Sequence, residues 1–185
     1  MQNQRQQPLA IALTVLSALG RLLPHAPNVT PLGGSCLFAG SRLDGAWAYL
    51  LPLVVMLATD PLAYFGHGYT LVSPAIYASF MINVWIGRRL LRGPHRVTPV
   101  RVGASAFVCS LQFFLLTNLA VWVTGSALGK PLYSADLAGL LRCYSVALPF
   151  WGRTLAGDLL FSGALFGFYE LLNRRAARAS TAVTA

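Results

Sequence analysis

The chain has 185 residues, of which 56% are hydrophobic and only 10% are charged, whereas about 25% of the residues in soluble domains are charged. Its formal net charge is +9, which in a soluble chain would favour nucleic acid as a partner. The apolar residues form runs of about 20, the number that a helix needs to cross a bilayer. Composition and patterning therefore exclude a cytosolic enzyme and predict an all-α integral membrane protein.

Six apolar runs predict six transmembrane helices. The first run ends at Pro24 and Pro27, which lack the N–H group that a helix needs. The second begins at Thr30 and Pro31, residues that suit the cap and the first position of a helix. With a length of only about 16 Å, this helix must be tilted, partial or shielded by its neighbours. The predicted helices cover residues 8–23, 30–41, 45–65, 71–91, 102–124 and 152–172.

The last third of the chain contains the longest interruption, residues 125–149. Only its second half, residues 135–147, predicts a short helix, which would lie at the membrane interface. The end of the chain is polar and rich in Ala, Ser and Thr. We therefore expect a single transmembrane domain over residues 1–173 and a disordered cytoplasmic tail over residues 174–185.

Two clusters of arginine predict the orientation. Loops rich in Lys and Arg remain in the cytoplasm, so both clusters and the N- and C-termini are predicted to be cytoplasmic, with His67 and Lys130 outside. The arginines lack interleaved aromatic residues and orientation already accounts for them, so no nucleic acid partner is expected. The clusters consist of Arg88, Arg89, Arg92, Arg96 and Arg101, and of Arg174, Arg175 and Arg178.

Charged and amide side chains inside the predicted helices fall near the outer end. Each ionisable residue there costs about 2.5 to 3.5 kcal/mol on insertion scales, so its position is informative. Arg153 and Asp158 are about 140° apart around the sixth helix, so each needs an opposite charge from elsewhere, and Arg21 and Asp60 are available. Interhelical ion pairs, a site for a neutral or zwitterionic solute, and a proton relay all remain open. The predicted ligand-binding residues are Arg21, His25, Asn28, Asp60, Asn118, Trp122, Arg153 and Asp158.

Catalytic and metal-binding patterns are not found in the sequence. No nucleophile motif, zinc motif or phosphate-binding loop is present, and Cys36, Cys109 and Cys143 are scattered without metal-ligand spacing. We expect no enzyme, no cofactor and no metal site. Active transport would then need energy from another subunit or from an ion gradient.

Small residues mark two possible helix contacts, because close approach drives helix association in lipid. Gly163 and Gly167 form a GxxxG pattern in the last helix. Ala10, Thr14 and Ala18 are spaced by four residues in the first helix. This second set either packs internally or forms a docking face for a partner membrane protein, and we predict it as the partner-docking site.

Three segments carry a family resemblance: GRLLPHAPNVTP at residues 20–31, LTNLAVW at 116–122 and PFWGRTLAGD at 149–158. They resemble a family of small bacterial membrane proteins described as transport proteins of unknown function, and the resemblance covers nearly the whole chain. That family is more weakly similar to the S components of energy-coupling factor vitamin transporters. These six-helix proteins hold a vitamin near the outer face and dock through small residues of helix one.

The resemblance implies an S-component-like six-helix bundle in the bacterial inner membrane. S components typically carry an Ala-x-x-x-Ala docking motif, whereas Thr14 occupies the middle position here, and no vitamin-specific residue set is recognisable. The leading hypothesis is a substrate-capture subunit that binds a small solute near the outer face and relies on energising transporter subunits. The alternative is a structural or accessory subunit of a larger membrane complex. An outer cavity would favour the first, and a filled outer end the second.

Overall fold

The computed structural model describes the backbone of residues 2–67, 73–93, 97–127 and 132–183, and the side chains of residues 7–62, 73–93, 97–125 and 132–179. Lys130 and Arg96 lie outside this part of the chain. Within it the protein is all-helical, with six α-helices, one short 3-10 helix and no strand, which confirms the predicted helical class. The elements are α1 Gln2–Leu19, η1 Gly20–Leu22, α2 Leu32–Arg42, α3 Trp47–His67, α4 Pro74–Leu90, α5 Pro99–Ala127 and α6 Leu137–Val183.

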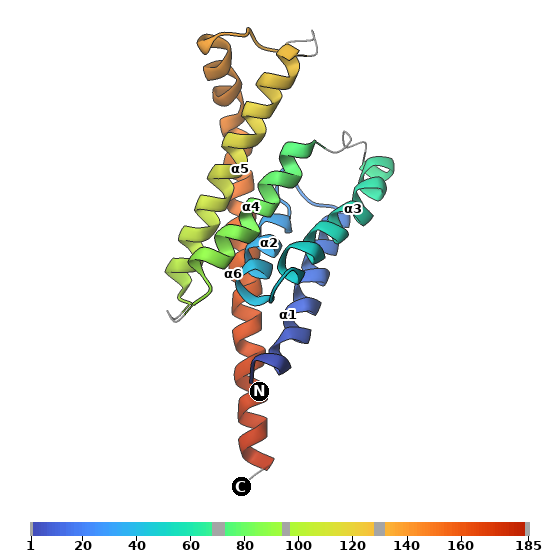
Figure 1. Ribbon diagram of the computed structural model, residues 1–185, viewed down its shortest axis with the longest axis vertical. Helices are drawn as coiled ribbons and strands as arrows, with labels where there is room; N and C mark the ends of the chain where they lie inside the picture. The colour runs from blue at the N-terminus through green and yellow to red at the C-terminus, as the bar shows by residue number, and fades with distance from the viewer. Residues whose placement is uncertain (1, 68–72, 94–96, 128–131, 184–185) are drawn as a thin grey trace.

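The short helix α2 lies at the centre of the molecule (Figure 1). It contacts α1, α3, α4, α5 and α6, and every residue from Leu32 to Ser41 is buried. At its start, the N–H of Leu32 donates to Thr30 Oγ1 at 3.4 Å, so Thr30 satisfies one of the N–H groups that the first turn leaves free. The expectation that neighbouring helices shield this short helix is confirmed.

Two glycines allow α2 and α4 to approach each other closely. A Cβ on Gly40 would lie 1.9 Å from the carbonyl oxygen of Val84, and a Cβ on Gly87 would lie 2.2 Å from the carbonyl oxygen of Leu37. Both obstacles are backbone atoms, which cannot turn away as a flexible side chain does. The α2–α4 contact therefore requires glycine at both positions, as is common where helix backbones touch in membrane proteins.

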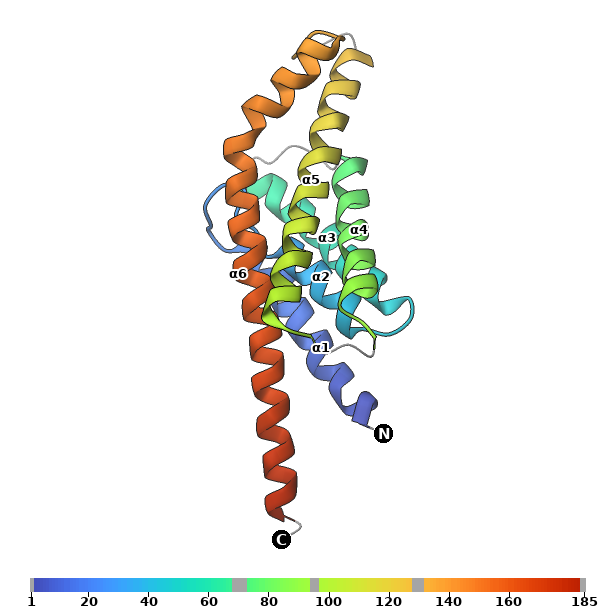
Figure 2. The same cartoon turned by 90° about the vertical axis from the view of Figure 1, so that its left-hand side faces the viewer.

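The last helix corrects two predictions. Residues 137–183 form one helix of 47 residues that passes through Pro149, whereas we expected a separate short helix at 135–147 and a disordered tail after residue 173. Proline removes one backbone hydrogen bond, but α5 packs along α6 (Figure 2). The contacts lie on both sides of Pro149, because the Tyr144 hydroxyl donates to the carbonyl oxygen of Leu115 and the Trp151 ring stacks on that of Phe114. In the tail, alanines favour helix, and Arg174 Nε donates to Glu170 Oε1 one turn earlier at 2.8 Å.

The long helices also set the shape of the molecule. The α5–α6 hairpin projects beyond the ends of α3 and α4, and the start of α1 and the end of α6 lie at the same end of the molecule (Figures 1 and 2). Two helical stretches, Pro99–Gly125 and Leu137–Ala179, are long and apolar enough to cross a membrane. Gln7–Leu22 and Trp47–Leu62 are shorter apolar helical stretches.

Candidate functional site

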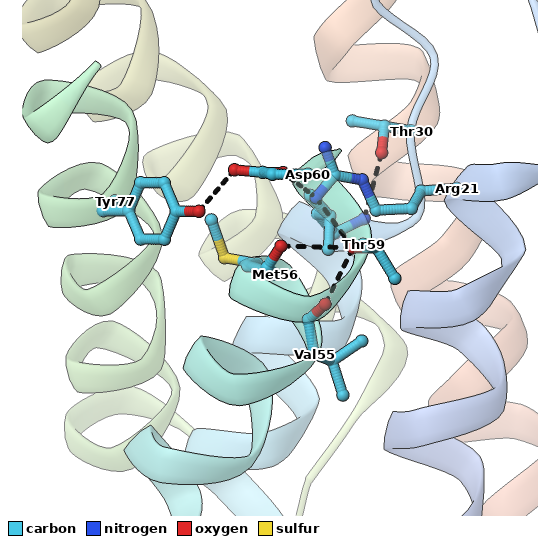
Figure 3. Close-up of polar contacts among 8 residues, drawn as sticks. Arg21, Thr30, Val55, Met56, Thr59, Asp60 and Tyr77 are labelled. Atoms are coloured by element: carbon cyan, nitrogen blue, oxygen red, sulfur yellow. Dashed lines mark hydrogen bonds and ion pairs between the residues drawn. The ribbon is translucent and has the colours of Figure 1, made fainter. Parts of the chain in front are cut away.

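Two of the predicted outer charges form an ion pair between η1 and α3. Arg21 Nη1 lies 2.6 Å from Asp60 Oδ1 and donates to Thr59 Oγ1 at 3.2 Å. The Tyr77 hydroxyl, from α4, donates to Asp60 Oδ2 (Figure 3). The side chains of Arg21 and Asp60 are 17% and 18% exposed. Arg21 and Asp60 therefore pair with each other, whereas we expected them to supply the opposite charges for Asp158 and Arg153. The ion pair fastens three elements of the bundle.

Arg153 and Asp158 do not join this cluster, so the prediction that all four charges meet is wrong. Arg153 is exposed and makes no ion pair with a described residue. Asp158 is only 3% exposed and packs against α2, where a Cβ on Gly33 would lie 1.9 Å from Asp158 Oδ1. The two residues point about 140° apart around α6, and the missing side chain of Gly33 makes room for Asp158 against α2.

The other four predicted ligand-binding residues are engaged locally and do not converge. Asn118 Nδ2 donates to the carbonyl oxygen of Phe114 at 2.8 Å, and Trp122 Nε1 donates to that of Ser134 at 2.9 Å. His25 Nδ1 lies 2.6 Å from the carbonyl oxygen of Leu23. Asn28 is exposed in the loop before α2 and adopts φ 66°. The described contacts thus assemble no solute site from these residues.

The small residues of α1 pack inside the protein. Ala10, Thr14 and Ala18 are each 0% exposed, and α1 contacts α2, α3 and α6. Thr14 Oγ1 donates to the carbonyl oxygen of Ala10 at 2.8 Å, one turn earlier in the same helix. The prediction that they form a partner-docking face does not hold in this arrangement, because the chain's own helices already cover them.

A cavity of about 750 Å³ lies at the opposite end from the Arg21–Asp60 pair. The end of α2, the connection between α4 and α5, the start of α5 and one side of α6 line it. None of the eight predicted ligand-binding residues lines it. Its charged lining residues are Arg42, Asp44, Arg92, Glu170 and Arg174, and its larger apolar ones are Leu91, Val97, Val102, Leu159 and Phe166.

Most of the charges around the cavity are balanced by pairing. Arg92 forms an ion pair with Asp44 and donates to the carbonyl oxygen of Leu43 at 2.7 Å. Arg174 pairs with Glu170. These two ion pairs compensate the charges of two of the three arginines. The net charge of the cavity therefore depends on the third arginine.

Arg42 is the third arginine, and no described carboxylate forms an ion pair with it. Its guanidinium carbon lies 4.8 Å from the ring centroid of Tyr169 and 5.5 Å from that of Phe166, distances that suit cation–π contacts. Its Nε atom is buried and has no hydrogen-bond partner. With three arginines against two carboxylates the cavity carries one excess positive charge, and the N-terminal end of α5 adds a favourable helix dipole for an anion.

The GxxxG residues of α6 line the same cavity. No atom lies within 4 Å of a Cβ built on Gly163 or on Gly167, so these glycines widen the cavity and do not contact another helix. The cavity is thus lined by arginines, by apolar side chains and by glycines that leave it wide. Such a space suits an anion with an apolar part. From the sequence we read the arginines only as orientation signals, because nothing in their spacing shows that three of them surround one space.

Metal ligands are not grouped in the described part of the chain. No three His, Cys, Asp or Glu side chains there are placed to hold a metal ion, and Cys36, Cys109 and Cys143 are buried free cysteines.

Comparison with known proteins places the chain in a family. No curated protein and no solved structure matches it. The family model that matches is described as a family of unknown function, DUF6580, and it covers residues 1–181. Since the match spans nearly all 185 residues, the chain belongs to the DUF6580 family.

Proposed function

We propose that the chain is a multi-pass protein of the bacterial inner membrane that binds a small anionic solute in the arginine-lined cavity, as the solute-binding subunit of a transport system. The cavity is the observation on which this proposal rests. Its volume of about 750 Å³ falls in the range of small-molecule sites, which are mostly apolar with a few placed polar groups. Partner subunits would supply the energy.

An apolar stripe on α3 supports the membrane location. Trp47, Leu50, Val54 and Leu57 recur every three to four residues, and each is at least 45% exposed. They therefore share one face of the helix. The 21 residues of α3 rise by about 31 Å, close to the roughly 30 Å of bilayer hydrocarbon. Lipid is the environment that stabilises such a face.

We infer from the arginine clusters that the cavity faces the cytoplasm, and not the outer face where we expected the solute site from the sequence. Labelling with a membrane-impermeant thiol reagent tests this in intact cells, in a background without the three native cysteines. Arg92→Cys should stay unlabelled until the cells are opened, and Lys130→Cys should react in intact cells. Labelling of Arg92→Cys in intact cells would reverse the orientation and place the cavity outside.

The solute is expected to carry a carboxylate or phosphate group beside an apolar part. Native mass spectrometry of the gently purified protein should show a bound small anion. Arg42→Gln, which removes the unpaired charge, and Gly163→Leu, which fills the space, should both lose it. Arg153→Gln, which removes an exposed arginine of α6, the helix that contains Gly163, should keep the bound anion. Retention of the anion by Gly163→Leu, or its absence from the unaltered protein, would contradict the proposal.

A second candidate is a structural or accessory subunit of a larger membrane complex. It is favoured by the Arg21–Asp60 ion pair, which occupies charges first considered for a ligand. The same mass spectra separate the two functions. An accessory subunit should retain a stoichiometric partner protein and no small anion.

A further inference from the structure

Asp158 is a buried acid that no described residue pairs with. It is 3% exposed, at the contact of α6 with α2. Asp158 Oδ1 occupies the place where a side chain of Gly33 would begin, 1.9 Å from the position of its Cβ. The structure therefore contains a space for this carboxyl group, created by a residue without a side chain.

The groups around Asp158 offer no counter-charge. From α2 and α5, the titratable groups close enough to interact electrostatically with the carboxyl are the thiols of Cys36 and Cys109. From η1, which follows α1, Arg21 is already bound to Asp60 and Thr59. On α6 itself, Arg153 is exposed. A carboxylate here would be a buried charge without a partner, which is strongly unfavourable, whereas the neutral acid is tolerated.

A second polar group lies one turn away on the same helix. The hydroxyl oxygen of Ser162 is buried and has no hydrogen-bond partner, and α2 approaches here so closely that a Cβ on Gly34 would lie 2.8 Å from the backbone nitrogen of Ser162. The residues that follow this polar pair, Leu159 and Gly163, line the cavity. The cavity therefore reaches the residue next to each of the two groups along α6, although neither Asp158 nor Ser162 lines it.

We propose that Asp158 is a proton-binding site: its carboxyl is protonated in this packing and exchanges its proton with water that reaches it from the cavity. The step breaks the O–H bond of the carboxyl group and forms an O–H bond on a water molecule, which gives a carboxylate and a hydronium ion. Ionisable residues inside membrane helices are costly and commonly mark functional proton pathways. This inference stands on the burial and isolation of Asp158 and does not depend on the identity of the solute.

Dicyclohexylcarbodiimide, an apolar reagent that enters membranes and reacts with protonated carboxyl groups, tests the protonation state. At neutral pH the purified protein should form a covalent adduct on the peptide that contains Asp158, and the reaction should slow as the pH is raised. Asp158→Asn should lose this adduct. Asp60→Asn, which removes the paired carboxylate, should keep it. Failure to label Asp158 at neutral pH would overturn the proposal.

Infrared spectroscopy then separates an exchanging acid from a sealed structural one. A carbonyl stretch of a protonated carboxyl should be present in the unaltered protein and in Asp60→Asn, and absent in Asp158→Asn. It should shift in D₂O while the protein remains folded, and it should decrease at alkaline pH. A band that neither shifts nor titrates would show a purely structural acid. If Asp158→Asn does not fold, the D₂O shift and the titration in Asp60→Asn decide the question.

Discussion

The two glycine pairs of this protein have opposite surroundings. Gly40 and Gly87 lie where α2 crosses α4, and each would push a Cβ into a backbone oxygen, whereas Gly163 and Gly167 face open space in the cavity. Only the second pair has the GxxxG spacing associated with close helix contacts. Spacing along one helix therefore does not identify a close contact, because the contact also depends on which atoms the facing helix places there.

The largest effect is expected at the glycine pair in close backbone contact, Gly40 and Gly87. Gly87→Ala should destabilise the protein by about 3 kcal/mol, because the new methyl group must displace backbone atoms of α2. Alanine is otherwise the better helix former. A loss of stability in Gly87→Ala therefore reports the backbone contact between α2 and α4 directly. The measurement is thermal unfolding in detergent together with the folded yield from size-exclusion chromatography. An unfolding temperature equal to that of the unaltered protein would show that α2 and α4 are not in backbone contact.

A smaller loss is expected at the ion pair that ties η1 to α3. Asp60→Asn should cost about 2 kcal/mol, because Arg21 loses a charged hydrogen-bond partner, and the partial exposure of both groups keeps the loss below that of a fully buried pair. Tyr77→Phe should cost about 1 kcal/mol. Adding Arg21→Gln to Asp60→Asn should recover part of the stability. A double variant as unstable as the sum of its single changes would show that the two residues do not act as a pair.

Substitution in the second glycine pair, Gly163 and Gly167, should change the stability in the opposite direction. Gly163→Ala should stabilise the protein by about 0.5 to 1 kcal/mol, because alanine loses less conformational entropy in a helix than glycine and the methyl group meets no neighbour. The same thermal unfolding experiment applies, with Gly87→Ala as the matched change. A loss of stability in Gly163→Ala would mean that this face of α6 packs against something, such as a tightly held ligand.

The smallest effect is expected at the tip of the α5–α6 hairpin, far from both pairs. The pKa of Asp136 is lowered because the N–H of Gly139 and then the hydroxyl of Ser134 donate to its carboxylate. A group whose pKa is lowered by folding stabilises the folded state above its ordinary pKa, about 3.9 for aspartate, and this contribution is lost as the pH falls through the lowered value.

The first turn of α6 should therefore fray only in acid. The amide proton of Gly139, followed by NMR in small micelles, should change its chemical shift as Asp136 becomes protonated, with a midpoint below the usual range of aspartate. Asp136→Asn should remove this transition and leave the rest of the spectrum unchanged. A Gly139 amide that does not respond to acid would contradict the cap.

Helix positions were largely predictable from local signals. The predicted helix at 45–65 is α3, Trp47–His67, and the predicted helix at 102–124 is α5, Pro99–Ala127. Apolar run length and proline position define such elements because each helix satisfies its own backbone hydrogen bonds. The continuity of α6 was missed because Pro149 and the polar tail are local signals that packing against α5 and the Glu170–Arg174 pair outweigh.

The candidate site was less predictable. The sequence indicated that a charge inside an apolar helix needs an opposite one, but it assigned Arg21 and Asp60 to the charges of the last helix, whereas they pair with each other. Asp158 was wrongly added to that cluster. The actual position of Asp158 depends on Gly33, because glycine has no side chain and leaves room for the carboxyl group. The cavity around Arg42 was not predicted, because its lining comes from three helices and two connections. Spacing within one helix carries no information about which other segments face it.

The helical class, the apolar lengths of the helices and the grouping of arginines could all be read from the amino-acid sequence, because they follow from local composition and from backbone hydrogen bonding within each helix. The folded arrangement was needed to show which glycines touch a neighbouring backbone, which charges pair, and where space remains between the helices. Those features depend on the rotation and crossing of helices that are far apart in the chain, and a change of one residue in register exchanges a buried face for an exposed one.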